Sequence, residues 1–213
     1  MRVTTLELGP FLARCVILSD EHSDAAIIVD PGFEARRVVA EVQRQRLAPE
    51  AIVLTHAHLD HAFGVPEVKE AFPSAPVLLH GEDVPLYGNL AMQAQVFGFP
   101  PPPAVPYDRL LSDGDRLQLG CDELLVRHTP GHSPGHIVLI HESGQPPLAV
   151  VGDVLFAGSI GRTDLWGGSL PALVRSIREV LYRLPPTTRV VPGHGPDTTI
   201  GEEIVSNPFV SGR

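Results

Sequence analysis

The chain has 213 residues, of which 43% are hydrophobic and 19% are charged, and this is the composition of an ordinary globular protein long enough to bury a core. The formal net charge of −9 disfavours nucleic acid as a partner, because such a surface repels phosphate backbones. No stretch approaches the roughly 20 apolar residues of a membrane span and the first residues lack the apolar run of a signal peptide, so we expect a cytoplasmic protein with no membrane partner.

The first half of the chain is expected to alternate strands with helices. Strands are predicted at 3–8, 11–18 and 25–29, and residues 34–46 then change to helical spacing. The elements expected after this helix are a buried strand at 51–54, a helix near 64–71, a strand at 76–80 and an interrupted helical stretch at 82–97. This order of elements indicates a first sheet with helices packed against it.

A proline-rich stretch at 98–106, GFPPPPAVP, can form neither a helix nor a central strand, and it is predicted to be a stiff connector to the second half. The elements predicted for that half are strands near 108–111, 116–120, 123–128, 136–141 and 148–152, a helix at about 170–183 and a strand at 188–191. Because this half again places strands before a helix, residues 1–213 are expected to form one domain of two sheets with helices outside.

The segment His56-Ala57-His58-Leu59-Asp60-His61 follows the buried strand at 51–54 and is the strongest sign of chemistry in the chain. In an extended segment, residues two apart point the same way, so His56 and His58 can converge on one ion. Asp60 and His61 come where the chain turns, and they can face a neighbouring ion. Imidazole and carboxylate groups are ligands that hold zinc, iron or manganese, so this segment indicates a metal site and not merely a polar turn.

Three more candidate ligands stand at later strand ends. His132 lies in the tight loop TPGHSPGH, whose glycines and prolines bring the backbone close to a neighbouring group. Asp153 follows the apolar run at 148–152, and a metal ion is the best partner for a charge in that position. His194 again follows a predicted strand and lies between two glycines. Together with the first cluster, these residues predict a metal-dependent active site.

The remaining histidines and the cysteines are expected to have structural roles. His128 and His136 flank the loop that carries His132, and we expect them to pack or hydrogen-bond beside the ligands, because a ligating histidine often needs an outer partner. His141 ends a strand and is expected to be exposed to solvent. Cys15 and Cys121 are too far apart to indicate a disulfide framework, and both are predicted to be small buried hydrophobic residues.

Taken in order, these candidate ligands resemble the pattern of the metallo-β-lactamase superfamily, and the resemblance covers nearly the whole chain. It implies an α/β fold, a four-layer αββα sandwich with a dinuclear metal site at one edge. The ligands that it implies are His56, His58 and His132 for the first ion, Asp60, His61 and His194 for the second ion, and Asp153 as a bridge between them. An aspartate at the bridging place, where other members have a cysteine, is similar to the glyoxalase II branch.

Three segments resemble the glyoxalase-II-like hydrolases, or hydroxyacylglutathione hydrolases, and above all their short single-domain bacterial members; these segments are 129–136, 152–165 and 192–196. Full-length glyoxalase II carries a helical C-terminal domain that binds glutathione, and this chain ends soon after Asn207-Pro208-Phe209, so we expect no such domain. The usual tyrosine beside the metal site is not evident, and Leu165 and Trp166 stand nearby. The resemblance therefore implies a thioester hydrolase whose thiol is left open.

The resemblance further implies two divalent metal ions, zinc first with iron or manganese as alternatives, and a small-molecule thioester as the substrate. Two metals lower the pKa of a shared water, and the resulting hydroxide attacks the thioester carbonyl while one metal stabilises the oxyanion. Asp60 and Asp153 are the residues expected to take part in catalysis. Arg162 is a candidate to contact the substrate, with pairing to Asp164 as the structural alternative. Trp166 is a candidate to line the entrance, with rim packing as its alternative.

Three other functions are compatible with these residues. Persulfide dioxygenases are similar to this chain, including a Gly-Arg-Thr-Asp segment at 161–164, and their single iron would be held by His56, His132 and Asp153. Those relatives commonly have a cysteine where His136 stands, which weakens this alternative. A metal-binding protein without catalysis is disfavoured, because a structural metal site is normally closed by four ligands. Hydrolysis of another ester or of a lactone has no positive feature in the sequence, and no feature indicates the oligomeric state.

Overall fold

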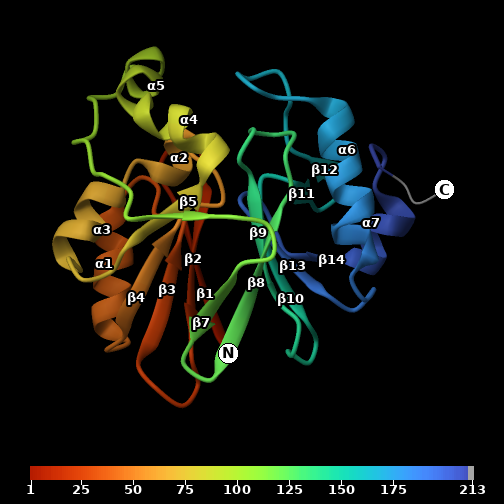
Figure 1. The fold of residues 1–213 in the computed structure, drawn as a ribbon, viewed down its shortest axis with the longest axis horizontal. Helices are drawn as coiled ribbons and strands as arrows, with labels where there is room; N and C mark the ends of the chain where they lie inside the picture. The colour runs from red at the N-terminus through yellow and green to blue at the C-terminus, as the bar shows by residue number, and fades with distance from the viewer. Residues whose placement is uncertain (211–213) are drawn as a thin grey trace.

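Two six-stranded β-sheets face each other in the computed structural model, which describes residues 1–210 (Figure 1). The first sheet has the order β1-β2-β3-β4-β5-β6, with strands β1 (Arg2–Leu8), β2 (Ala13–Ser19), β3 (Ala25–Val29), β4 (Ala48–Val53), β5 (Val77–His80) and β6 (Arg109–Leu111). The second sheet has the order β14-β13-β10-β9-β8-β7, with strands β7 (Arg116–Leu119), β8 (Asp122–His128), β9 (Ile137–His141), β10 (Leu148–Gly152), β13 (Arg189–Pro192) and β14 (Thr198–Thr199). A separate hairpin consists of β11 (Leu155–Phe156) and β12 (Ser159–Ile160).

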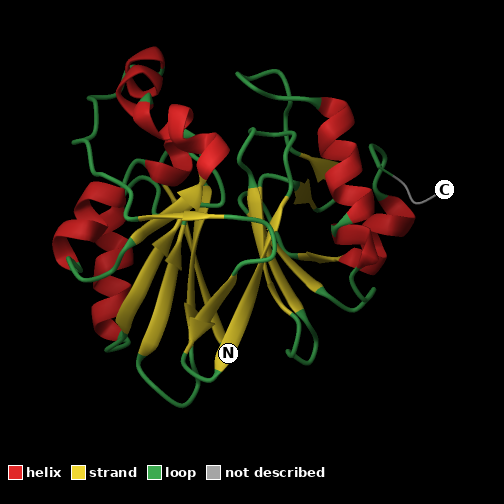
Figure 2. Cartoon of the chain, viewed as in Figure 1, coloured by secondary structure: helices red, strands yellow, loops and turns green. Residues whose placement is uncertain are grey.

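Helices cover the outer faces of both sheets (Figure 2). The helices beside the first sheet are α1 (Ala35–Arg44) and α3 (Val65–Ala71), and those beside the second sheet are α6 (Leu170–Glu179), the 3₁₀ turn η2 (Leu181–Arg183) and α7 (Ile200–Ser206). The short helices at one edge of the sandwich are α2 (Leu59–Ala62), the 3₁₀ turn η1 (Gly81–Asp83), α4 (Val84–Gly88) and α5 (Leu90–Val96). Within residues 1–210 no helix is both long enough and apolar enough to cross a membrane.

The alternation of side chains along the central strands produces three hydrophobic cores. Strands β2 and β3 are buried at every position, so both of their faces need cover. Ile17 and Ile28 pack between the first sheet and its helices, where Val38 of α1 joins them. The adjacent residues Leu18 and Ile27 point to the opposite face and pack against the second sheet. A third core lies between the second sheet and α6, which confirms the predicted four-layer αββα sandwich.

The predicted elements agree with the structure to within about three residues, except that α2 was expected to be a turn and that differences arise near the centre and the end of the chain. The strand expected to open the second half is β6, and it pairs in parallel with β5 of the first sheet, with Leu110 opposite Leu79. The second sheet therefore begins only at β7. The hairpin β11–β12 and strand β14 were not predicted, because two-residue strands show no periodicity. Helix α7 was also not predicted. Helix α7 begins with a capping box of Thr199 and Glu202, a signal that could have located it.

Two residues differ from the burial expected for them. Cys15 is buried as predicted, but Cys121 is exposed, because it lies in the turn between β7 and β8. His141 was expected to be exposed, and it is buried. Its Nε2 atom lies 2.9 Å from Oδ1 of Asp122 on the neighbouring strand β8, and this carboxylate supplies the partner that a buried imidazole needs.

The strands that precede the candidate site residues end at the edge that carries α2, α4 and α5. Strands β3, β4 and β5 run parallel to one another, and so do β10 and β13 in the second sheet. Strand β8 shares the direction of β10, because both pair antiparallel with β9. The carboxyl ends of parallel strands lie at one edge of a sheet, so the loops after these strands come together there. The residues in those loops include Asp30, His56, Asp83, His132, Asp153 and His194.

Candidate metal centre

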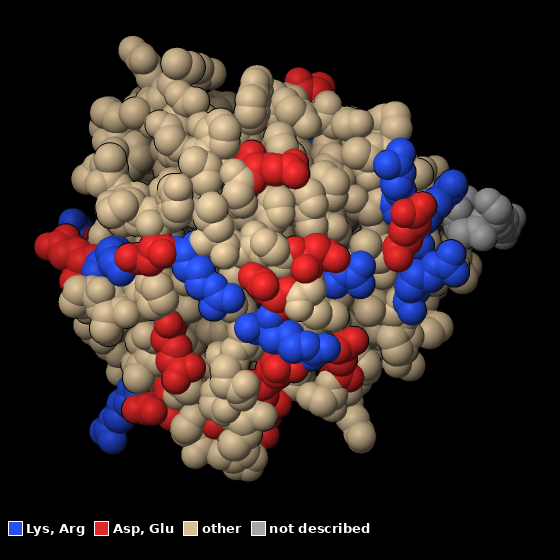
Figure 3. All heavy atoms as spheres, in the orientation of Figure 1, with Lys and Arg blue, Asp and Glu red and all other residues tan. Residues whose placement is uncertain are grey.

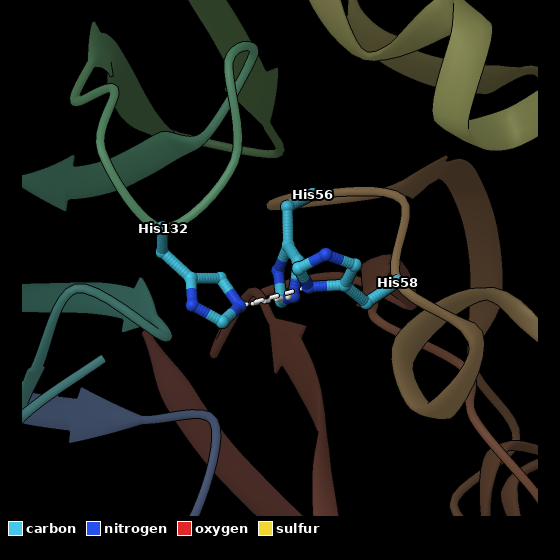
Figure 4. A group of neighbouring side chains, drawn as sticks. All are labelled: His56, His58 and His132. Atoms are coloured by element: carbon cyan, nitrogen blue, oxygen red, sulfur yellow. Dashed lines mark hydrogen bonds between the residues drawn. The ribbon is translucent and has the colours of Figure 1, made fainter. Parts of the chain in front are cut away.

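Three histidines from both sheets form the first ligand group. His56 and His58 lie in the loop after β4, and His132 lies in the loop after β8. Nε2 of His132 is 3.2 Å from Nε2 of His56 and 2.8 Å from Nδ1 of His58, and Figure 4 shows the three rings pointing toward one another. All three side chains are buried. Three imidazole nitrogens that meet in this way could form one face of a metal coordination sphere.

A second group lies beside the first and contains a carboxylate. Asp60 and His61 belong to α2, and His194 follows β13. Nε2 of His194 is 3.2 Å from Oδ2 of Asp60 and 3.4 Å from Nε2 of His61. The one-turn helix α2 places Asp60 and His61 next to His194, while the His61 ring still packs on His56 with centroids 4.2 Å apart, so the two groups adjoin. The structure therefore brings all six of these predicted ligands into two adjacent sets.

Asp153 lies between the two groups. Its Oδ2 atom is 3.5 Å from Nε2 of His132 and 3.6 Å from Nε2 of His194, and its Oδ1 atom is 3.4 Å from Nε2 of His61. Oδ1 is buried and has no hydrogen-bond partner among residues 1–210. A buried carboxylate oxygen without a partner is costly, and a cation bound between the groups would satisfy it. The seven residues thus fit a pair of divalent metal ions.

Outer hydrogen bonds fix the orientation of three ligand rings. Nδ1 of His132 is 2.8 Å from the carbonyl oxygen of Arg162, and Nδ1 of His194 is 3.1 Å from that of Phe11. Since a carbonyl can only accept, each Nδ1 carries the proton and each Nε2 presents a lone pair to the centre. His61 is held in the same way, because its Nδ1 donates to Oδ2 of Asp30 over 3.0 Å. Such partners are what metal-binding histidines require.

Asp30 supports both groups, and sequence reasoning did not identify it as a site residue. Besides His61, its carboxylate accepts hydrogen bonds from the backbone N–H of Thr55 at 2.7 Å and from the Thr55 hydroxyl at 2.6 Å. The same hydroxyl lies 3.1 Å from Nδ1 of His56. Asp30 adopts the left-handed conformation, with φ of 53°, at the end of buried strand β3. That place at the end of an apolar strand is the signal that identified Asp153, and it could have identified Asp30.

His136 supports the centre without belonging to either ligand group. Its Nε2 accepts a hydrogen bond from the backbone N–H of Asp153 over 3.0 Å, and its ring stacks on His56 with centroids 4.8 Å apart. His128 donates from Nε2 to the carbonyl oxygen of Pro134 over 2.8 Å. The supporting roles expected for both residues are confirmed: His136 lies beside the candidate ligands, and His128 packs on His80 with ring centroids 4.0 Å apart.

The two ligand groups differ in their electrostatics. Burial and the neighbouring His132 lower the pKa of His58 to about 3, and burial likewise lowers the pKa of His132 to about 4. Burial would also lower the pKa of His61, but the carboxylates of Asp153, Asp60 and Asp30 outweigh it and raise that pKa to about 10. The first group therefore offers neutral imidazoles, while the second group is rich in negative charge that a cation would offset.

Asp83 clamps together the two loops that carry the first group. Its Oδ2 accepts hydrogen bonds from the backbone N–H of Ala57 and from the hydroxyl of Ser133, each over 2.9 Å, and its Oδ1 accepts one from the N–H of Gly135 over 2.6 Å. The carboxylate is fully buried. It sets the distance between the loop of His58 and the loop of His132. The sequence gives no sign of this role, because it depends on contacts between three separate loops.

A cavity of about 820 Å³ opens above the centre, and both predicted substrate contacts line it. The guanidinium of Arg162 pairs with the carboxylate of Asp164 through bonds of 2.7 and 2.8 Å, so the structural alternative for this side chain is observed. Trp166 lies at the rim with 61% of its surface exposed. Contact of either residue with a substrate stays a prediction.

Replacing Gly193 with alanine is expected to weaken metal binding by about 10- to 100-fold, the usual effect of disturbing groups that hold ligands in place. A Cβ atom at this position would lie 2.2 Å from Oδ1 of Asp153 and 2.8 Å from Cε1 of His61, so both ligands must move. Metal titration of the purified variant measures the change, and circular dichroism checks the fold. Gly88→Ala is the control, because its Cβ meets no described atom within 4 Å. Equal metal affinity of the two variants would contradict the expectation.

Comparisons with known proteins agree with this geometry. A family model described as the metallo-beta-lactamase superfamily matches residues 8–194, a span that includes all seven candidate ligands. The hydroxyacylglutathione hydrolase GloC of Haemophilus influenzae is 37% identical over 214 residues, which cover 100% of both chains. The structure of the BLEG-1 B3 metallo-beta-lactamase superposes with a TM-score of 0.87, 40% identity and coverage of 98% of this chain and 99% of that one. The structure of TTHA1623 in a di-iron-bound form has a TM-score of 0.87, 42% identity and coverage of 97% and 100%.

Proposed function

The chain belongs to the metallo-β-lactamase superfamily, a superfamily of metal-binding hydrolases, and on this premise we propose that it is a thioester hydrolase of the hydroxyacylglutathione hydrolase type. The observation that carries the proposal is Asp153, whose carboxylate faces His132 of one ligand group and His194 of the other. The full-length similarity to GloC supports the thioester as substrate class. A small-molecule substrate in the cytoplasm is part of the same proposal.

We assign the first metal ion to His56, His58 and His132, the second to Asp60, His61 and His194, and the bridging position to Asp153. When bound, two divalent ions act as Lewis acids toward a carbonyl and lower the pKa of water to near neutral. Zinc is the first choice for these ligands, and iron or manganese suits the same donor set. The di-iron form of the similar TTHA1623 supports iron as the alternative.

Residues of the chain keep the Asp60 carboxylate ionised and keep the histidine rings of the site in a fixed orientation. Burial would raise the pKa of Asp60, but His61 and His194 outweigh it and keep that pKa below its usual value, so the carboxylate is ionised at neutral pH. Because Asp60 also lines the cavity, it can accept a proton from a water molecule there. The outer partners Asp30 and Arg162, through its carbonyl, keep the imidazole nitrogens aimed at the centre. A thiolate leaves readily, so no strong protein acid is needed.

Metal analysis combined with a hydrolysis assay tests the proposal. The freshly purified protein is expected to hold about two metal ions, and it should hydrolyse S-lactoylglutathione or the acetyl thioester of N-acetylcysteamine. A chelator should abolish hydrolysis, and added zinc should restore it. One iron per chain, no hydrolysis and oxygen consumption with glutathione persulfide would contradict the proposal and indicate an oxygenase that uses His56, His132 and Asp153. Turnover of a lactone or a β-lactam alone would instead identify a different hydrolase of this superfamily.

A further inference from the structure

The cavity above the metal centre has a polar floor and apolar walls. The residues on the floor are His58, Asp60, His132, Asp153 and His194. One wall is formed by α4, α5 and the residues next to them, and it includes Leu86, Met92, Val96 and Phe97. The opposite wall is formed by the β11–β12 hairpin and the following loop, and it includes Phe156, Ile160, Leu165 and Trp166. A molecule whose reacting group sits at the floor must therefore pass between two apolar surfaces.

Several of these wall residues are unusually exposed for their chemistry. The exposed fractions of Met92, Val96, Phe97 and Trp166 are 62%, 75%, 53% and 61%. Soluble proteins seldom leave large apolar side chains clustered in the open unless a ligand or partner covers them. In Figure 3 the surface over α5 is formed by uncharged residues. Because these exposed apolar side chains line the same cavity as the candidate metal ligands, an apolar part of the substrate is the group expected to cover them.

The charges around the cavity do not suit a thiol with free carboxylates. Arg162 is the only lysine or arginine among the described residues that line the cavity. Its guanidinium donates two hydrogen bonds to the carboxylate of Asp164. The other charged lining residues are Asp60 and Asp153, which are acidic. Glutathione carries two carboxylates, and a site that recognises it should offer unpaired cations to match them. The walls of this cavity present apolar side chains and no unpaired lysine or arginine among the described residues.

We propose that the substrate is a thioester with an apolar acyl chain, and that this chain lies between α5 and the loop that carries Trp166. The inference rests on the proposed thioester hydrolysis. Carrier thiols are generally polar, so the apolar part of a thioester is its acyl group. Each methylene that leaves water should improve binding about three- to fivefold until the cavity is filled. Val96, as the most exposed of the wall residues, is then a determinant of chain-length preference.

Acyl thioesters of one neutral thiol, N-acetylcysteamine, test this inference on the metal-loaded protein. We expect kcat/KM for the octanoyl thioester to exceed that for the acetyl thioester by on the order of 10³-fold, because six more methylenes leave water. The octanoyl thioester should also be preferred over S-lactoylglutathione. Val96→Glu places a charge on the apolar wall and should reduce the octanoyl-to-acetyl ratio at least about fivefold. Val205→Glu is the matched control, because Val205 of α7 is 71% exposed and lies outside the cavity lining.

A binding measurement separates the inference from the proposed function. Trp166 is the only tryptophan in the chain, so its fluorescence reports on the cavity directly. The octyl thioether of N-acetylcysteamine, which cannot be hydrolysed, is expected to bind at least about tenfold more tightly than S-methylglutathione, and Val96→Glu should weaken it. Equal hydrolysis of all thioesters, or a preference for S-lactoylglutathione, would overturn the inference and leave thioester hydrolysis standing. Hydrolysis of no thioester would contradict the proposed function, and the thioether titration would still decide whether the cavity takes an apolar chain.

Discussion

Asp153→Asn is expected to lower kcat/KM by on the order of 10²- to 10³-fold, the scale of losing one strong electrostatic contact in an active site. The change keeps the shape of the side chain but removes its charge. An amide cannot replace a carboxylate whose two oxygens lie within 3.6 Å of nitrogens from both ligand groups. Metal content should fall as well, because the Asp153 carboxylate lies directly against nitrogens of both groups.

Metal analysis and thioester hydrolysis on the same preparation measure this effect. Asp24→Asn is the matched control, since Asp24 is exposed and lies far from the centre in the turn before β3. The control should keep the metal content and rate of the unaltered protein. If Asp153→Asn kept both metals and hydrolysed at the original rate, the assignment of Asp153 as the shared ligand would be wrong.

Asp83→Asn is expected to destabilise the fold and to weaken metal binding without touching a ligand. Hydrogen bonds to a charged group contribute about 1.5–3 kcal/mol each, and the three donors on Asp83 act together, so we expect a loss of about 2–4 kcal/mol in the free energy of unfolding. Both oxygens of Asp83 accept hydrogen bonds, and asparagine replaces one of them with an NH₂ group, which would face a donor and could not accept its hydrogen bond. For a domain of this size the loss corresponds to a decrease of about 4–15 °C in Tm.

The effect on the metal follows from the position of Asp83 between two loops. When the clamp loosens, His58 and His132 lose their fixed spacing, and metal affinity should fall by about 10- to 100-fold. Thermal unfolding and metal titration measure the two changes. Glu82→Gln removes the same charge one residue earlier, on an exposed side chain, and should change neither quantity. A loss of stability with unaltered metal affinity would mean that Asp83 serves the fold alone.

The candidate ligands were predictable from the sequence because several of them stand where a buried strand ends. His56, His132, Asp153 and His194 follow apolar runs that are recognisable by length and branching alone, and the structure brings these side chains together. Spacing alone separated His56 and His58 from Asp60 and His61, and the family resemblance added the places of His132, His194 and Asp153. Asp30 carries the same strand-end signal, and it was overlooked because the adjacent proline and glycine already explained the turn.

Other parts of the site depend on contacts that no local pattern records. Asp83 acts through Ala57, Ser133 and Gly135, which come from two other loops. The cavity walls come from opposite halves of the chain, so their apolar character emerges only after the sheets have packed. The prediction that β6 belongs to the second half was wrong for the same reason. The sequence of a three-residue strand does not show which strand it will pair with, and β6 pairs with β5 of the first sheet.

Each candidate ligand group has members from both halves of the chain, so a metal ion bound by either group would connect the two halves. The first group links the loop after β4 to the loop after β8, and the second links α2 to the loop after β13. Pulling the halves apart would therefore break both coordination spheres at once, and neither half alone contains a complete one. Metal ions bound there would also stabilise the packing of the two sheets, so loss of metal and separation of the sheets would be thermodynamically coupled.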